Sequence, residues 1–297
     1  MSKLEFKKVT YDDANAIKPY LGQIDTDCAD YSMGIIMLWK DFLGLEFCIY
    51  EDTFFMKGTF NGCERFYIPC GKLSLEDSFS LIFDHCKQNG IEPQFVSVPK
   101  TKIDEISKFI DIEYSESRDY SDYVYKANDL AKLSGRTYHQ KRNHIAKFKK
   151  NAPNYRVVEI TDNTIELVKE FYLKFQSKYP AESKSEIIER TATQNAIDYY
   201  DKIGLFGIFL ELDEKVIAFT FGEVKNDILF VHIEKADREI SGSYPVINNE
   251  FVKFCVEKYG IKWVNREDDS GDEGLRKAKL SYKPDHLAVK GKMKFMM

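Results

Sequence analysis

Long apolar runs, closely spaced cysteine pairs and a surplus of positive charge are all missing from this sequence. The longest uncharged apolar run, 31–39, is much shorter than the roughly 20 residues that a membrane-spanning helix needs. The N-terminus is charged from the start and lacks the apolar segment of a secretory signal peptide. We therefore expect a cytoplasmic protein without a transmembrane segment, whose contact with a membrane would be peripheral.

The cysteines and the net charge exclude further classes. No cysteine forms a CxxC pair, and Cys63 and Cys70 lack the nearby histidine of a zinc site. Reduced thiols in an intracellular protein are the plain interpretation. A net charge of -5 argues against a nucleic-acid binder by overall charge, so any anion site must be local. The hydrophobic fraction of 43% is enough for a sizeable core.

Apolar periodicity predicts one order of elements twice along the chain: a three-stranded meander, a helix, a strand, a helix and a strand. We expect a boundary near 128–135, which gives domains 1–130 and 131–297. The first half contains strands 46–50, 53–58 and 65–69, helix 75–88 ended by Asn89-Gly90, strand 94–98, helix 102–110 and strands 112–114 and 120–125. The second contains helices 164–178 and 187–202, strands 207–212, 215–223 and 227–234, helix 246–259, strand 261–265, helix 273–282 and strand 285–289.

A cationic segment, 135–150, holds six lysines and arginines and no acid. On a helix, Tyr138, Ile145 and Phe148 share one apolar arc, and Lys141 points into that arc. Lys141 must therefore either extend to solvent or find a carboxylate partner. A solvated helix face explains the outer cations equally well. By position rather than by charge count, we expect three residues to bind substrate or to form a structural ion pair: Lys141, Arg142 and His144.

An acidic turn follows the strand at 261–265, with five carboxylates between residues 267 and 273. It is not an EF-hand loop, because the sixth and twelfth positions hold Glu273 and Lys279. We predict no metal site, although a single magnesium ion is a minor alternative. Helix capping by Ser270 or Asp272 accounts for the end of the turn. It does not account for the residues that directly follow the strand, where α/β folds place their ligands. We therefore expect Asn265 and Arg266 to bind substrate, and a carboxylate of Glu267 or Asp268 to orient or deprotonate an attacking amine.

The motifs at 142–150 and 265–284 resemble the DUF2156 family, which is similar to the C-terminal domain of phosphatidylglycerol lysyltransferases. The order of elements resembles the GCN5-related N-acetyltransferase (GNAT) fold in tandem. The resemblance implies an α/β (α+β) fold of two GNAT-like domains, each a mixed, mostly antiparallel twisted sheet flanked by helices. More distant similarity reaches the Fem-type and leucyl/phenylalanyl-tRNA–protein transferases. A multi-span membrane domain like that of the lysyltransferases is not expected here, which weakens the case for a phospholipid acceptor.

The same resemblance assigns roles to individual residues. It implies that Tyr282 is a general acid toward the leaving group, and we add Lys277 and Lys279 as substrate-binding residues. In GNAT enzymes the loop at 238–244 holds the pyrophosphate of CoA. Here Arg238 and Gly242 are one residue too far apart for the usual pattern, and Pro245 removes an N–H donor. The candidates for phosphate binding in this loop are Arg238, Ser241, Gly242 and Ser243.

Together these features predict an acyl- or aminoacyltransferase without a tightly bound cofactor. The donor would be an acyl-CoA or an aminoacyl-tRNA, and the acceptor an amine or hydroxyl on a small molecule, a peptide or a lipid headgroup. Positioning and an oxyanion site would supply most of the catalysis. The alternative is a non-catalytic GNAT-like module that binds RNA or an anionic headgroup. The carboxylates after the strand favour the enzyme, and the degenerate phosphate loop favours the binding module.

Overall fold

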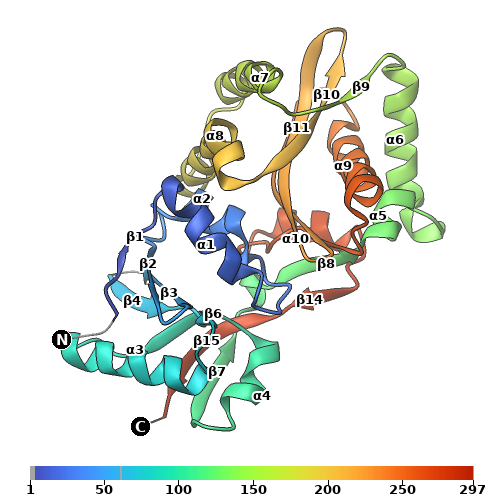
Figure 1. Cartoon of the computed structure of the whole chain (residues 1–297). Helices are drawn as coiled ribbons and strands as arrows, with labels where there is room; N and C mark the ends of the chain where they lie inside the picture. The colour runs from blue at the N-terminus through green and yellow to red at the C-terminus, as the bar shows by residue number, and fades with distance from the viewer. Residues whose placement is uncertain (1–3, 61, 297) are drawn as a thin grey trace. The chain divides into compact units, whose positions relative to one another are not determined.

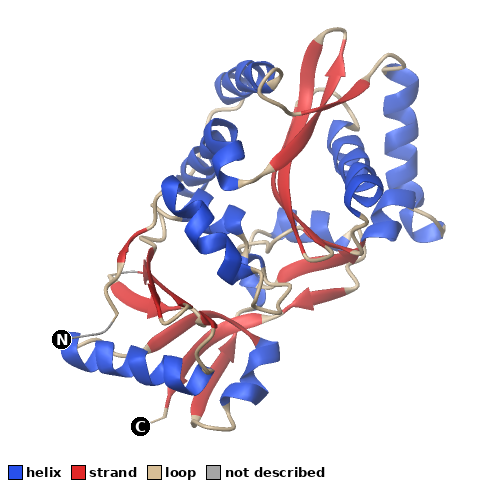
Figure 2. Ribbon diagram, in the orientation of Figure 1, coloured by secondary structure: helices blue, strands red, loops and turns tan. Residues whose placement is uncertain are grey.

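The computed structural model describes residues 4–60 and 62–296. It contains two compact units, neither of which is one continuous stretch of sequence. Unit 1 comprises residues up to 123 together with 267–276 and 287–297, and unit 2 comprises 124–266 and 277–286. Figure 1 traces the chain through both units, and Figure 2 shows that each contains sheet flanked by helices.

The sheet of unit 1 is mostly antiparallel, with one parallel pair between β4 and β6. A short strand, β5 (Cys70–Gly71), pairs with β3 outside the main order. In sheet order the other strands are β1 (Lys7–Lys8), β2 (Glu46–Tyr50), β3 (Thr53–Phe60), β4 (Cys63–Phe66), β6 (Gln94–Pro99), β15 (Lys290–Phe295) and β7 (Ile112–Glu116).

The helices of unit 1 begin and end at residues suited to those positions. The Ser74 side chain caps α3 by accepting from the Asp77 N–H, and Gly90 ends this helix in the left-handed conformation at φ 67°. Aromatic rings fill the space between α3 and the sheet, with Phe79 and Phe95 centroids 5.0 Å apart. The α-helices of this unit are α1 (Ala14–Leu21), α2 (Met33–Trp39), α3 (Leu75–Asn89) and α4 (Ile103–Ile106).

The sheet of unit 2 repeats this plan, with a parallel pair between β12 and β13. In order its strands are β14 (His286–Ala288), β8 (Asp122–Lys126), β13 (Trp263–Asn265), β12 (Ile228–Ala236), β11 (Lys215–Lys225), β10 (Phe206–Leu212) and β9 (Arg156–Glu159). The helices that accompany it are α5 (Ala127–Lys132), α6 (His139–Asn151), α7 (Ile165–Lys178), α8 (Lys184–Ile203), α9 (Ser243–Tyr259) and α10 (Glu273–Leu280).

Each sheet contains one strand that the order of elements along the chain would give to the other sheet. In unit 1, β15 lies between β6 and β7, and in the second sheet β8 lies between β13 and β14. The two insertions are equivalent, because β8 follows β7 in the chain as β15 follows β14. The repeated order of elements is therefore accompanied by a reciprocal exchange of the final strand.

The predicted fold class is confirmed: both sheets are mixed, mostly antiparallel and flanked by helices. Several short elements were not predicted from the sequence, namely α1, α2, α5, β1, β5, β9 and β15. The predicted helix 102–110 was too long, because only Ile103–Ile106 is α-helical after a 3-10 turn. The strand predicted at 65–69 ends at Phe66. Helix α9 begins at Ser243, three residues before the predicted start.

The compact units also differ from the predicted division into 1–130 and 131–297. The segments 267–276 and 287–297 belong to unit 1, although the prediction gave every residue after 130 to one domain. The difference follows from the exchanged strand, since β15 carries the C-terminal end of the chain into the first sheet.

We predict that Gly291→Ala lowers the unfolding temperature by disturbing the insertion of β15. A Cβ at this position would lie 2.2 Å from the Ser115 carbonyl oxygen, so β15 could not keep its distance from β7. The expected cost is about 1–3 kcal/mol, as for other overpacked sites. Thermal denaturation followed by circular dichroism measures it. The matched control is Gly22→Ala, where the nearest atom to an added Cβ is 3.9 Å away; equal stability of the two variants would contradict the prediction.

Candidate functional site

The ladder between β12 and β13 ends before β12 does. Their last paired residues are Phe230 and Asn265, whereas β12 continues to Ala236. His232 is an extra residue on β12 opposite β11, so the strand has a bulge just beyond that point. The carboxyl ends of adjacent parallel strands and the neighbourhood of bulges are common places for binding sites. The side chains that gather there come from β12, α6, α9 and the segments after β13 and α10.

Tyr282 provides the centre of this cluster. Its ring is buried, and two cations face it: the Lys141 Nζ lies 3.8 Å from the ring centroid and the Arg266 guanidinium carbon 4.9 Å from it. The backbone of Tyr282 is fixed by the Tyr138 hydroxyl, which donates to its carbonyl at 2.9 Å. Cation–π contacts of this kind gain strength where water is excluded. The aromatic ring therefore contacts two positively charged groups.

Arg266 and Lys141 differ in how their charges are balanced. Arg266 pairs with Glu234 at 3.3 Å, and Asn248 of α9 donates to the other oxygen of that carboxylate at 3.1 Å. Lys141 has no carboxylate within ion-pair distance among residues 4–60 and 62–296. Of the two alternatives that the sequence offered for Lys141, the carboxylate partner is therefore wrong, and the half-buried side chain faces the Tyr282 ring instead.

The surroundings change the acidity of both groups. Burial, reinforced by the neighbouring Arg266 charge, lowers the pKa of Lys141 to about 8. Burial raises the pKa of the Tyr282 hydroxyl to about 12, so that it keeps its proton at neutral pH. The cluster thus combines a weakly held lysine proton, a protonated phenol and a guanidinium of fixed position. A bound anion would supply the negative charge that Lys141 lacks.

The acidic turn after Arg266 belongs to unit 1 and is largely structural. Asp269 is fully buried and accepts from the Tyr123 hydroxyl at 2.5 Å, from Arg276 at 2.7 and 2.9 Å and from the Gly271 N–H at 3.0 Å. Hydrogen bonds from Arg276 hold the pKa of the Asp269 carboxyl well below the usual range. Asp272 accepts from the Leu275 N–H at 2.6 Å at the start of α10, which is the predicted capping role.

The predicted catalytic acids also lie in this turn. Asp268 accepts from both the N–H and the hydroxyl of Ser270, and its carboxylate is 3.9 Å from the Lys290 Nζ. Lys290 is buried and pairs with Asp30 and Asp122, the latter at 2.9 Å. Glu267 has a left-handed backbone at φ 59°, and its carbonyl accepts from the Tyr123 N–H. The role of these two acids in catalysis stays a prediction.

Most residues of the loop predicted to bind phosphate, 238–243, already make contacts within the protein. The Ser243 N–H donates to the Ile240 carbonyl, and its buried hydroxyl donates to the Asp237 carbonyl at 3.0 Å. Gly242 at φ 93° is pressed against α6, where an added Cβ would lie 2.8 Å from the His144 carbonyl oxygen. The Arg238 guanidinium lies 4.9 Å from the Tyr179 ring centroid. Ser241 is exposed.

Other predicted residues are distributed as follows. Arg142 donates to the Leu133 and Gly135 carbonyls at 2.5 and 2.6 Å, while His144 is exposed on α6. Asn265 is buried on β13. Lys277 is exposed and Lys279 is buried, and both belong to α10. The structure thus brings Lys141, Arg266 and Tyr282 together in unit 2.

Sequence reasoning missed Glu234 and Asn248, which fix Arg266. A signal for Glu234 was present, because it is an acid near the end of the apolar strand ILFVHIE. Asn248 follows a helical pattern among buried residues of α9, where a polar side chain needs a partner. Neither could be matched to Arg266 without the pairing of β12 with β13.

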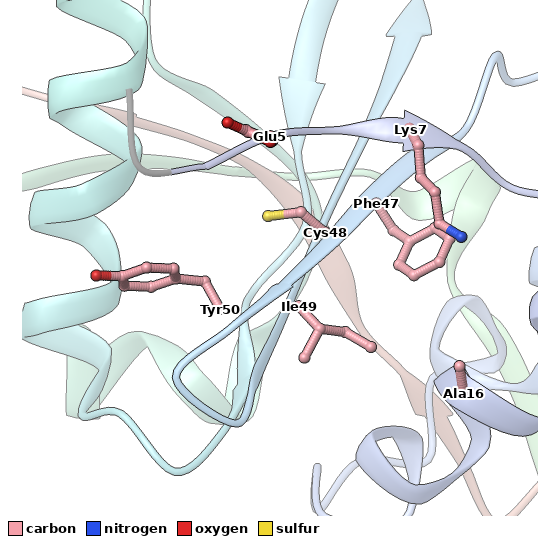
Figure 3. A pocket seen from close by; sticks show the side chains of 7 residues that line it. All are labelled: Glu5, Lys7, Ala16, Phe47, Cys48, Ile49 and Tyr50. Atoms are coloured by element: carbon pink, nitrogen blue, oxygen red, sulfur yellow. The ribbon is translucent and has the colours of Figure 1, made fainter. Parts of the chain in front are cut away.

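A surface depression of about 410 Å³ on unit 1 is a weaker candidate for a functional site than the cluster around Tyr282. Figure 3 shows its lining residues, which include none of the predicted site residues. Burial raises the pKa of the Cys48 thiol in this lining to about 12, so the pocket presents no reactive thiolate. Its lysine, Lys7, pairs with Asp13 at 2.7 Å.

The comparisons with known proteins place the chain in a family of transferases. The chain belongs to the family described as phosphatidylglycerol lysyltransferase, C-terminal, whose sequence model matches residues 23–290. Within the part of the chain that the structure describes, no helix is both long enough and apolar enough to cross a membrane.

Three relatives illustrate the similarity. A conserved protein of unknown function from Bacteroides thetaiotaomicron VPI-5482 has a TM-score of 0.88 and 29% identity, over 99% of this chain and all of that one. The C-terminal DUF2156 domain of a protein described as a lysylphosphatidylglycerol synthetase from Agrobacterium fabrum has a TM-score of 0.67 and 11% identity, over 96% of this chain and 92% of that one. An uncharacterized protein, MYCGA3080, from Mycoplasmoides gallisepticum is 25% identical over 67% of this chain, and the match spans 60% of that protein's length.

We predict that Lys141→Met stabilises the protein at neutral pH. The folded state lowers the pKa of Lys141, so its protonated form opposes folding below about pH 8. Between pH 8 and the pKa of the unfolded chain, the unfolded state binds more protons, and the stability of the native sequence rises with pH. The gain in unfolding temperature should therefore be largest below pH 8 and should shrink toward pH 10. A variant less stable than the native sequence at pH 7 would show that the lysine is a structural cation.

Proposed function

We propose that this protein transfers an aminoacyl group from an aminoacyl-tRNA to an amine or hydroxyl acceptor, and that the cluster around Tyr282 is its active site. The observation that carries the proposal is the uncompensated Lys141 beside Arg266 on one aromatic ring. An enzyme that binds a phosphate-bearing donor needs such a local positive site, and active sites often store this kind of destabilisation. Membership of the lysyltransferase family supports aminoacyl transfer over other acyl transfer.

The chemistry requires one bond to form and one to break. The acceptor nitrogen or oxygen attacks the ester carbonyl carbon of the donor, and the bond from that carbon to the ribose oxygen breaks. In the proposal Lys141 and Arg266 stabilise negative charge on the donor and on the developing oxyanion. The Tyr282 hydroxyl, which is protonated at neutral pH, gives its proton to the leaving ribose oxygen. Glu234 and Asn248 act as positioning residues because they fix the Arg266 guanidinium.

The phosphate loop supports aminoacyl-tRNA over acyl-CoA as the donor. A pyrophosphate cradle needs several backbone N–H groups that point outward from the start of a helix. Here Pro245 has no N–H, the Ser243 N–H already has an acceptor, and Gly242 packs on α6. The acceptor is proposed only by class, as an amine or hydroxyl on a small molecule, a peptide or a lipid headgroup.

A donor comparison tests this function. Purified protein is incubated with a mixture of aminoacyl-tRNAs or with acyl-CoAs of several chain lengths, together with phosphatidylglycerol vesicles, small amines or peptides. Mass spectrometry then measures how much acceptor has gained the aminoacyl or acyl group. We expect transfer from aminoacyl-tRNA that Lys141→Met reduces strongly. Transfer from acyl-CoA alone would overturn the choice of donor, and no transfer from any donor would favour the non-catalytic alternative.

Two substitutions separate the hydroxyl of Tyr282 from its ring. Tyr282→Phe keeps the ring under Lys141 and Arg266 but removes the proton donor, so kcat should fall by about 10²-fold or more with little change in unfolding temperature. Tyr282→Leu should lower both, because the cation–π contacts are lost. Equal kcat for Tyr282→Phe and the native sequence would remove the phenol from the proposed mechanism.

The proposed general base is tested in the same assay. The sequence predicts that Glu267 or Asp268 orients or deprotonates the acceptor amine. The variant that removes this carboxylate, Glu267→Gln or Asp268→Asn, should therefore lower kcat. Asp272→Asn is the matched control, because it removes a neighbouring charge and asparagine can still cap α10. If both variants turn over at the native rate, these two acids have no catalytic role.

A further inference from the structure

A groove of about 500 Å³ lies on unit 2 between α5, α6 and α9. Figure 1 shows α6 and α9 side by side, and α5 packs on α9. Four of the residues that line the groove are cations: Lys132, Arg142, Lys149 and Lys253. No lining residue is an acid. We call this the α5–α6–α9 groove.

The cations of the groove exceed the acids near it. Lys149 and Lys253 share a single carboxylate, Glu250, at 3.2 Å from each Nζ. Lys132 forms no ion pair among the described residues. Arg142 uses only its Nη1 atom to donate to backbone carbonyls, so the protein fixes its guanidinium and leaves two nitrogens for another acceptor. The groove therefore holds a local surplus of positive charge in a chain whose net charge is -5.

Further cations extend this surface along α6. Lys147 and Lys150 are exposed on this helix, and Arg136 is exposed in the 3-10 turn before it. None of the three forms an ion pair within the described part of the chain. A helix of 13 residues is roughly 20 Å long at 1.5 Å per residue. Such a line of charge suits several successive phosphates better than one headgroup.

The surface of α6 also distinguishes RNA from a membrane. Helices that lie in a membrane interface bury large apolar side chains beside their cations. Among the described residues of α5 and α6, none is an exposed large hydrophobic residue. We infer that the α5–α6–α9 groove and the outer cations of α6 bind the phosphodiester backbone of an RNA. Given the proposed function, on which this identification rests, the RNA is the aminoacyl-tRNA donor.

Salt-dependent binding tests the inference. Uncharged tRNA with a fluorescent label is titrated with the full chain at several KCl concentrations between 50 and 300 mM. The triple variant Lys132→Gln, Lys149→Gln and Lys253→Gln should bind more weakly, and the slope of log K against log[KCl] should fall in magnitude by about 2–3. The matched control, Lys174→Gln with Lys184→Gln and Lys215→Gln, removes the same charge from exposed positions on α7, α8 and β11 and should change neither quantity.

Kinetics separate this inference from the proposed function. In the transfer assay the groove variant should raise KM for aminoacyl-tRNA several-fold and keep kcat, whereas Lys141→Met lowers kcat. If the groove variant keeps the native affinity, salt slope and transfer activity, the groove does not bind tRNA, but the proposed function is unaffected. Absence of both tRNA binding and transfer in the native protein would overturn both. Co-sedimentation of the native protein with phosphatidylglycerol vesicles, lost in the groove variant and without tRNA binding, would assign the groove to a lipid headgroup instead.

Discussion

The pairing of β15 between β6 and β7, and of β8 between β13 and β14, is the constraint on which the rest of this structure depends. A sheet gains main-chain hydrogen bonds when an inserted strand gives both neighbours a partner, and neither insertion is local in sequence. Gly291 of β15 pairs at once with Val98 of β6 and Glu116 of β7. The chain must therefore return from unit 2 to unit 1 after residue 286, and Tyr282 lies on the last stretch of unit 2 before that return.

Buried charge maintains this path inside unit 1. Asp269 has a hydrogen-bond donor for each side of its carboxylate, and Arg276 and Tyr123 supply most of them. Lys290, at the start of β15, pairs with Asp30 and Asp122, and burial raises the pKa of Asp122 to about 6 despite the lysine. A buried ion that loses its partner costs several kcal/mol, so these clusters select one register of the returning chain. Much of the acidic density that first suggested a catalytic turn is thus explained by folding.

Local chemistry was readable from the sequence, whereas long-range pairing was not. Gly90 ends α3 and Asp272 caps α10 because these residues act on their own helix. The helical arc of α6 likewise predicted that Ile145 and Phe148 are buried and that Lys141, which is half-buried, shares their side of the helix. Its actual partner, Tyr282, is 141 residues further on, and no periodicity connects the two. The strand β15 carries lysines at alternate positions and has no apolar run, so its sequence does not predict a central strand, although Lys290 and Met293 are buried.

One helix, α6, carries both proposed interactions with the donor. At about 100° per residue, Lys141 faces the Tyr282 ring while Lys147 and Lys150 face solvent. The apolar side of this helix is buried through Tyr138, Ile145 and Phe148. Gly242, which has no side chain, allows α6 to pack closely on the start of α9. Binding of phosphates along the outer face would therefore act on the same rigid element that positions Lys141. That coupling favours a donor long enough to reach both faces of α6, and a tRNA meets this condition where an isolated acyl-CoA does not.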